Sequence, residues 1–231
     1  MPDAHALLSL SASSKWLACP PALAMELPFP NTTSAASEAG TRAHALGEWK
    51  IKLALGHLTD EEAARRPPCD DESMDEHTDD YRDFVLAEAG PNPEFFGVEV
   101  LVDTGVPDCW GTSDNLSIPQ ASRRLKVVDL KYGYRKVAAD GTQLKGYGLG
   151  GLNEIDGLHD VDTVECIIFQ PRLGWIDRVV YTADEVRAFQ AELLAAGNAA
   201  KKYLLTAKYL TPENVVAIHA GLNPGEKQCE W

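Results

Sequence analysis

Five short segments in the middle and later parts of the chain alternate apolar and polar residues or are rich in β-branched residues, which is the pattern of β-strands. In the first of them, FFGVEVLVDT, valine occupies every second position, so one face of this strand is predicted to be buried. A turn near residues 119–122 would pair the second strand with the third. The predicted strands cover residues 95–104, 109–119, 123–133, 161–172 and 174–182.

Helices are predicted before, between and after these strands. A serine-rich start leads into a short helix that Pro20 and Pro21 interrupt, and a capping box of Thr182 and Glu185 begins the clearest helix. Glycine costs a helix about 1 kcal/mol relative to alanine, so we expect the glycine-rich helix to pack closely against the sheet. The predicted helices cover residues 7–27, 32–56, 77–90, 141–158 and 182–208, whereas residues 60–76 are expected to form an exposed, mobile loop and residues 210–231 to be irregular.

This order of elements predicts the α/β class, with a mixed central β-sheet flanked by helices. The length of 231 residues suits one sizeable domain, and we find no internal repeat. We therefore expect a single domain over residues 1–231, in which an N-terminal helical part, about 1–90, packs on a sheet core, about 95–210.

The charge is unevenly distributed along the chain. The formal net charge of −14 argues against a general nucleic-acid coat, but most of the acidic excess lies in residues 60–84. Residues 121–145 are locally basic, which is compatible with phosphate binding. Within them, only Asp129 and Asp140 oppose the cations Arg123, Arg124, Lys126, Lys131, Arg135, Lys136 and Lys145.

The cysteines and the hydropathy favour a cytoplasmic protein with reduced thiols. The five cysteines are scattered without a CxxC pair, so a zinc ribbon is unsupported. No apolar run approaches the roughly 18 residues of a membrane span, and the start of the chain lacks the basic region of a signal peptide. We accordingly expect no membrane partner.

Two aspartates and a lysine lie on the second and third predicted strands. If these strands pair, Asp114 and Asp129 can meet at one end of the sheet, where two close carboxylates need a cation such as Mg²⁺. Lys131 stands two residues after Asp129, so both project to the same face. A surface strand with alternating charges would also explain this pattern, but the neighbouring Val128 and Leu130 indicate a strand that is at least half buried.

These motifs together resemble the RecB-like branch of the PD-(D/E)XK nuclease superfamily. The branch shows a histidine in an N-terminal helix, then GxxD, DxK and QxxxY; the chain offers GTRAHALGE, GTSD, DLK and QLKGY in the same order. The opening LSASSKWLACPPAL and the later FQPRLGWIDRVVYTADE extend the likeness over nearly the whole chain. The chain is similar to phage and prophage exonuclease-like families and to CRISPR-associated RecB-like nucleases. The resemblance implies a restriction-endonuclease-like core.

The resemblance also assigns roles to single positions. His44, Asp114 and Asp129 would be metal ligands, with the Leu130 carbonyl as a further one and Glu99 as a supporting carboxylate. Lys131 would be the catalytic lysine, and Gln143 and Tyr147 would contact DNA near the cut. Each assignment has an alternative. His44 could be a helix histidine whose hydrogen bonds are satisfied by its neighbours, and Glu99 could lie on the solvent side of its strand. Gln143 and Tyr147 could serve the packing of the helix on the sheet.

The cysteines match the resemblance only in part. Several RecB-like nucleases hold a [4Fe–4S] cluster with one N-terminal and three C-terminal cysteines. Cys19 matches the first of these and Cys229 the second, but the remaining two ligands are missing, so the set is incomplete. The chain is then either a cluster-free member or shorter than its relatives. We expect the other three cysteines to be structural: Cys69, Cys109 and Cys166.

The function that follows from the resemblance is a Mg²⁺-dependent (or Mn²⁺-dependent) deoxyribonuclease, with an exonuclease role in phage or prophage DNA recombination or processing. DNA would be the main partner, joined by a phage recombinase or single-strand annealing protein. Homo-oligomers occur among phage exonucleases of this superfamily, and the sequence leaves a monomer and a homo-oligomer both open. The cations expected to hold the DNA backbone are Arg123, Arg124, Arg135 and Lys136. One alternative is a catalytically inactive nuclease fold that binds DNA or protein; a different phosphoesterase, or a structural phage protein, ranks lower.

Overall fold

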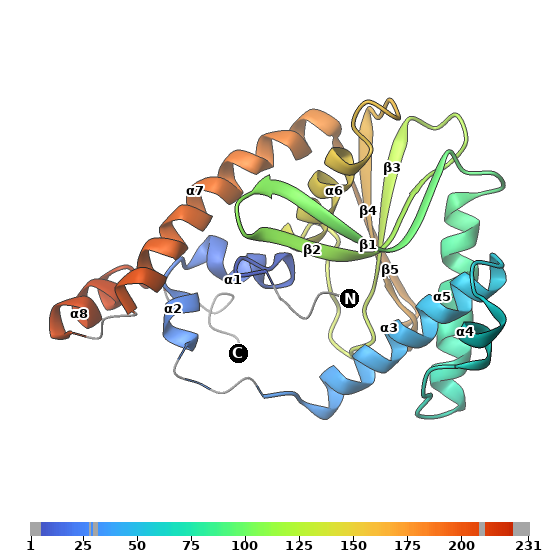
Figure 1. Cartoon of the computed structure of the whole chain (residues 1–231), viewed down its shortest axis with the longest axis horizontal. Helices are drawn as coiled ribbons and strands as arrows, with labels where there is room; N and C mark the ends of the chain where they lie inside the picture. Colours follow the sequence, from blue (N-terminus) through green and yellow to red (C-terminus); the bar gives the residue numbers. More distant parts are fainter. Residues whose placement is uncertain (1–5, 28, 30–31, 208–210, 224–231) are drawn as a thin grey trace.

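The computed structural model describes residues 6–27, 29, 32–207 and 211–223, and consists of one five-stranded sheet with helices on both faces (Figure 1). The strands are β1 (Phe95–Val106), β2 (Cys109–Ile118), β3 (Arg124–Leu130), β4 (Thr163–Gln170) and β5 (Trp175–Thr182). The helices are η1 (Leu10–Ala12), α1 (Ser13–Ala18), α2 (Ala22–Glu26), α3 (Ala35–Ala54), α4 (Asp60–Ala64), α5 (Glu72–Ala89), α6 (Thr142–Glu154), η2 (Pro171–Leu173), α7 (Ala183–Ala207) and α8 (Pro212–Ala220).

The sheet is mixed, as the pattern predicts. The strand order is β1-β2-β3-β4-β5, and every neighbouring pair is antiparallel except β3 and β4, which are parallel. A parallel pair needs a crossover connection, and α6 supplies it. The chain is therefore of the α/β class, and all five predicted strands are confirmed.

Two hydrophobic clusters lie on opposite faces of the sheet. On one face, α6 and α7 cover Leu125, Val127 and Val164, joined by Trp16 from the N-terminal helices. On the other face, α3 and α5 cover side chains of β3 and β4. The strand members of this second cluster are Val128, Leu130, Ile167 and Phe169. Successive residues of β3 thus alternate between two buried faces, which is typical of a central strand.

The glycines of α6 allow this helix to approach the sheet closely. A Cβ atom added to Gly148 would lie 2.8 Å from Val164 Cγ1, and one added to Gly150 would lie 2.7 Å from Val102 Cβ. Side chains at these positions would collide with the sheet. The expected close packing of the glycine-rich helix is confirmed.

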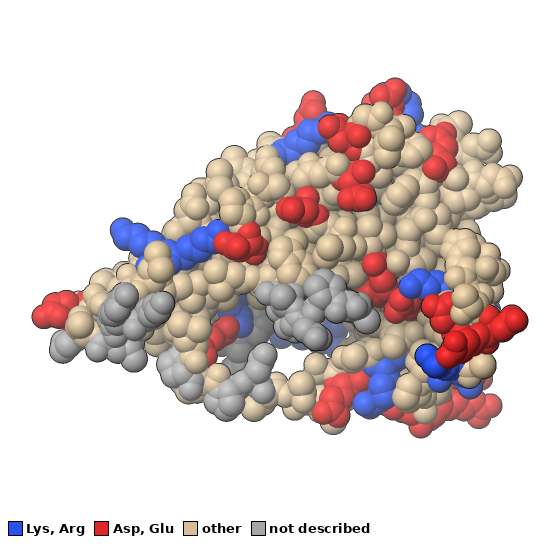
Figure 2. Space-filling view, viewed as in Figure 1, with Lys and Arg blue, Asp and Glu red and all other residues tan. Residues whose placement is uncertain are grey.

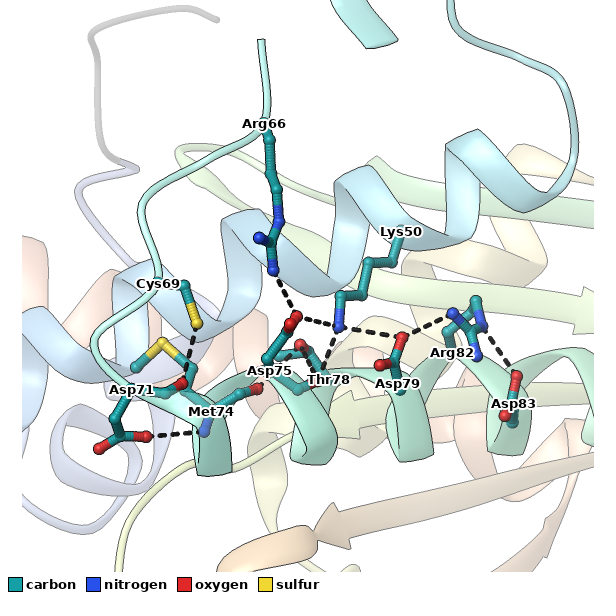
Figure 3. Close-up of polar contacts among 10 residues, drawn as sticks. All are labelled: Lys50, Arg66, Cys69, Asp71, Met74, Asp75, Thr78, Asp79, Arg82 and Asp83. Carbon is teal, nitrogen blue, oxygen red and sulfur yellow. Dashed lines mark hydrogen bonds and ion pairs between the residues drawn. The ribbon is translucent and has the colours of Figure 1, made fainter. Parts of the chain in front are cut away.

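A buried lysine joins α3 to α5 (Figure 3). Lys50 is 6% exposed, and its Nζ lies 2.5 Å from Asp75 Oδ1 and 2.9 Å from Asp79 Oδ1. The same ammonium donates to the Asp75 carbonyl at 2.6 Å. Arg66 and Arg82 bind the two aspartates from the solvent side. Because the buried charge is fully paired, the contact fixes the position of α3 over the sheet.

Two of the predicted irregular segments contain helices. Residues 60–76 hold α4, which begins with a capping box of Thr59 and Glu62, and α5 starts at Glu72 with Asp71 as its cap. Residues 210–231 contain α8, for which Thr211 accepts from the Asn214 N–H. The expectation of loops was wrong here because polar caps, and not apolar periodicity, define these helix starts.

The acidic excess of residues 60–84 lies mostly on α4 and α5, where acidic and basic side chains are interspersed (Figure 2). Across the described part of the chain, no helix has the length and hydrophobicity that spanning a membrane requires.

Candidate metal centre

The site forms where β2 separates from β3. The ladder between these strands contains three pairs, Asn115↔Val128, Leu116↔Val127 and Ser117↔Lys126. Asp114 directly precedes Asn115 on β2 and lies just outside this ladder. Its Oδ2 accepts a hydrogen bond of 2.7 Å from the backbone N–H of Leu130. Asp114 precedes Leu116 by two residues and Asp129 follows Val127 by two, so both carboxylates lie on the side of the sheet that α6 covers.

A histidine and a glutamate join Asp114. His44 comes from α3, and its Nδ1 lies 3.3 Å from Asp114 Oδ2. Glu99 comes from β1, between two residues that pair with β2 on either side of Asp114. One ligand atom from each of His44, Glu99 and Asp114 lies within 4.8 Å of the other two. Three donor atoms this close together could hold a single metal ion.

The backbone of Glu99 is in the left-handed region, with φ of 52°. A residue other than glycine rarely adopts this conformation, because it costs about 1–3 kcal/mol, and such residues gather at functional sites. The pairs Val98↔Asn115 and Val100↔Ser113 hold the backbone on both sides. The side chain of Glu99 consequently does not follow the regular alternation of side chains between the two faces of the strand.

Asp129 and Lys131 continue the site toward α6. Asp129 is 1% exposed, and its Oδ2 lies 2.8 Å from Lys131 Nζ. Lys131 donates to Gln143 Oε1 at 3.2 Å, and Gln143 Nε2 donates to the Tyr147 hydroxyl at 2.9 Å. The predicted DxK and QxxxY residues thus form one chain of contacts from the carboxylate to α6.

The charges of these groups shift one another's protonation. Burial opposes the protonation of His44, but the attraction of the Asp114 carboxylate outweighs it and raises the pKa of His44 to about 9. Burial and the charge of Asp114 raise the pKa of Glu99 to about 7. Burial raises the pKa of Asp129 as well, although Lys131 opposes this. Burial would raise the pKa of Asp114, yet His44 and the Leu130 N–H lower it.

These residues fit a divalent cation. Carboxylate oxygens are the donors that Mg²⁺ and Mn²⁺ prefer, and one imidazole is compatible with Mn²⁺ in particular. The charge of Asp114 contributes to the raised pKa of both His44 and Glu99, so both groups hold their protons more tightly than usual. A bound cation would release those protons.

Tyr81 is a site residue that the sequence did not indicate. Its hydroxyl is buried and has no hydrogen-bond partner among the described residues. Burial and the charges of Asp114, Asp129 and Glu99 raise its pKa well above the usual range. A hydrated ion would offer this hydroxyl the partner it lacks. The spacing along α5 predicts that Tyr81 is buried but not which neighbours it has.

Leu130 contributes its backbone N–H to the site, as the donor to Asp114. That the Leu130 carbonyl binds the metal remains a prediction.

The basic residues fall into two groups. Arg123 binds Asp162 through two nitrogens, each at 2.8 Å, and Arg124 lies 3.3 Å from Glu165. Both arginines stand at the start of β3, the end of the strand opposite to Asp129, so the structure does not bring them to the site. Arg135 and Lys136 follow Lys131 in the loop after β3 and are exposed. This second group contacts β4 and β5, where the Arg135 carbonyl accepts from Gln170 and the Lys136 ammonium lies over the Trp175 ring.

The cysteines do not form a cluster within the described part of the chain. Cys19 is buried, and its Sγ accepts a hydrogen bond of 3.4 Å from the Asn223 N–H. Cys229, its predicted companion, lies outside the described residues. Cys69, Cys109 and Cys166 are free thiols, and the last two are buried.

A comparison with protein families finds that residues 5–215 match the family model described as protein of unknown function (DUF2800). The match spans the helices of the N-terminal part, the whole sheet and α7.

Proposed function

The chain belongs to the DUF2800 family, and we propose that it is a Mg²⁺- or Mn²⁺-dependent deoxyribonuclease that hydrolyses phosphodiester bonds. One observation carries the proposal. The donor atoms of His44, Glu99 and Asp114 converge within 4.8 Å, and the Asp129–Lys131 pair stands on the adjoining strand. The mixed sheet with its α6 crossover is compatible with a restriction-endonuclease-like core.

Each residue has a separate task in this reaction. His44, Glu99, Asp114 and Asp129 would hold the cation, which when bound acidifies a water molecule and offsets negative charge. Lys131 is partly buried beside Asp129, whose attraction overcomes the cost of burial and raises the pKa of the lysine, so the ammonium stays protonated. It can then stabilise the charge that develops on the phosphate. Gln143 keeps the ammonium in place through its Oε1 atom.

The biological setting rests on the resemblance alone. We propose an exonuclease of phage or prophage DNA recombination or processing in the cytoplasm of a bacterial host, acting with a recombinase or annealing protein. The complete set of Asp114, Asp129 and Lys131 favours catalysis over a binding-only role, because a site that had lost its activity would be free to lose these residues.

The test is cleavage of end-labelled linear and circular DNA by the purified protein, with Mg²⁺, with Mn²⁺ and with chelator. We expect metal-dependent cutting that Asp129→Asn or Lys131→Ala reduces about 10²–10³-fold or more. The matched control is Asp184→Asn, because Asp184 lies in a described helix with a side chain that is 96% exposed. If both site variants cut as fast as the unmodified protein, the assignment is wrong. DNA binding without cutting in any metal would favour the inactive module.

A further inference from the structure

Aromatic rings and cations alternate where the loop after β3 meets the connection between β4 and β5. We call this set the stacking surface: Tyr132, Tyr134, Lys136, Arg172 and Trp175. The Arg172 guanidinium lies 4.0 Å from the centre of the Tyr132 ring and 4.6 Å from that of Tyr134. The Lys136 ammonium lies 3.8 Å from the centre of the Trp175 ring. Each cation therefore rests on an aromatic face, where it is attracted without being neutralised.

The loop that carries these side chains is fixed to the sheet. The buried Gln170 accepts a hydrogen bond of 2.7 Å from the Val137 N–H and donates one of 2.9 Å to the Arg135 carbonyl. Asp177 accepts a hydrogen bond of 2.7 Å from the Ala139 N–H. The loop is consequently anchored to β4 and β5, and its exposed side chains are presented on a defined support.

Tyr134 is exposed to an unusual degree for an aromatic residue, with 73% of its surface accessible. Tyr132, two residues earlier, is buried against Phe169, so Arg172 links an inner ring to an outer one. Among the described residues, neither Arg172 nor Lys136 forms an ion pair within 4 Å, although the charge of Arg172 contributes to lowering the pKa of Asp71. These cations stand out on a chain of net charge −14, and they suit an anionic ligand with flat apolar groups.

Along the chain, the stacking surface begins directly after Lys131, with Tyr132. The Lys131 N–H donates to the Phe169 carbonyl at 2.9 Å, which continues the pairing of β3 with β4 up to the catalytic lysine. Tyr134 follows three residues later, and three residues span at most about 11 Å. That reach corresponds to one or two nucleotides of a polynucleotide whose phosphate lies at Lys131.

We propose that the stacking surface binds single-stranded DNA next to the phosphate that is cut, with a base stacked on Tyr134 and the backbone held by Lys136 and Arg172. The inference rests on the proposed function for the nature of the ligand. A single strand is required because bases within a duplex stack on one another and leave no face free for Tyr134. Stacking on an aromatic side chain is tolerant of sequence, so we expect no base preference.

The test measures the anisotropy of fluorescein-labelled dT12 in the presence of chelator, so that binding is read without cleavage. We expect Tyr134→Ala to bind about tenfold more weakly and Tyr134→Phe to bind like the unmodified protein. Phe29→Ala is the control, because Phe29 is 72% exposed and lies near α2, away from this loop. Thermal unfolding of each variant verifies that it is folded.

Three results would overturn the inference: Tyr134→Ala binding as tightly as the unmodified protein, a duplex of the same length competing equally with dT12, or rU12 binding more tightly than dT12. The proposed function fails by a different result, namely no cutting in any metal. In that case Tyr134-dependent binding of dT12 would still support the stacking surface.

Discussion

His44 Nδ1 lies 3.3 Å from Asp114 Oδ2, although one residue belongs to a helix on the α5 side of the sheet and the other to a strand side chain on the α6 side. The contact is made just beyond the short β2–β3 ladder, whose last pair on this side is Asn115↔Val128. The candidate metal centre therefore depends on how α3 packs against the β1–β2 hairpin.

Removal of the histidine should weaken metal binding. Even the partners of metal ligands contribute 10- to 100-fold to affinity, so we expect His44→Ala to weaken Mn²⁺ binding by about tenfold or more, measured by isothermal titration calorimetry. His159→Ala is the control, because His159 also faces a carboxylate, Glu94, at 3.8 Å, but outside the site. Equal affinities for His44→Ala and the unmodified protein would show that His44 is not a ligand.

Metal binding should depend on pH in a predictable direction. The pKa of His44 is raised to about 9 and that of Glu99 to about 7, so both groups carry protons at and below pH 7 that a cation must displace. The affinity for Mn²⁺ should thus rise from pH 6 to pH 9, with proton release that fades above pH 9. Calorimetry in buffers of different ionisation enthalpy measures the released protons, and a pH-independent affinity would contradict the shifts.

Stability in acid should depend on Glu88. A hydrogen bond from Arg178 lowers the pKa of Glu88 from 4.5 to about 2, against burial and with the help of Lys126. Its ionised form stabilises the fold fully above pH 4.5, and this contribution is lost as the pH falls toward 2. We expect Glu88→Gln to lower the free energy of unfolding at pH 7 by about 1–2 kcal/mol after solvent screening, and to reduce its decline between pH 4.5 and 2 in urea titrations.

Two glycine substitutions should have opposite effects. In Gly148→Ala the new methyl group would meet Val164 at 2.8 Å, so we expect a loss of about 1–3 kcal/mol in the free energy of unfolding. Gly40 lies in α3, and a Cβ there would meet nothing within 4 Å, so Gly40→Ala should gain about 0.5–1 kcal/mol from helix propensity alone. Urea unfolding of both variants separates packing from propensity, and a stabilised Gly148→Ala would refute the close contact.

Local patterns predicted where the strands lie, because runs of β-branched residues favour them. The alternation in β1 predicted burial only in part, since Val98 packs in the cluster under α3 and α5 whereas Val100 and Val102 pack in the cluster under α6 and α7. The same period of two placed Lys131 beside Asp129, and the ion pair at 2.8 Å is the consequence. The left-handed backbone of Glu99 could not be predicted, since it arises from pairing on both sides of the residue. The ion pair of Arg123 with Asp162 could not be predicted either, because Asp162 follows the α6 crossover and is distant in the sequence.

The three-pair ladder between β2 and β3 has a consequence for the whole β1–β2 ribbon. The ribbon carries Glu99 and Asp114 and is joined to the rest of the sheet by few backbone bonds, while Asp129 stays on the central strand. A cation bound by Glu99 and Asp114 of this ribbon and by Asp129 of β3 would cross-link the ribbon to the central strand. The metal would then stabilise the fold in addition to taking part in the reaction. Its binding should slow amide hydrogen exchange along the β1–β2 hairpin.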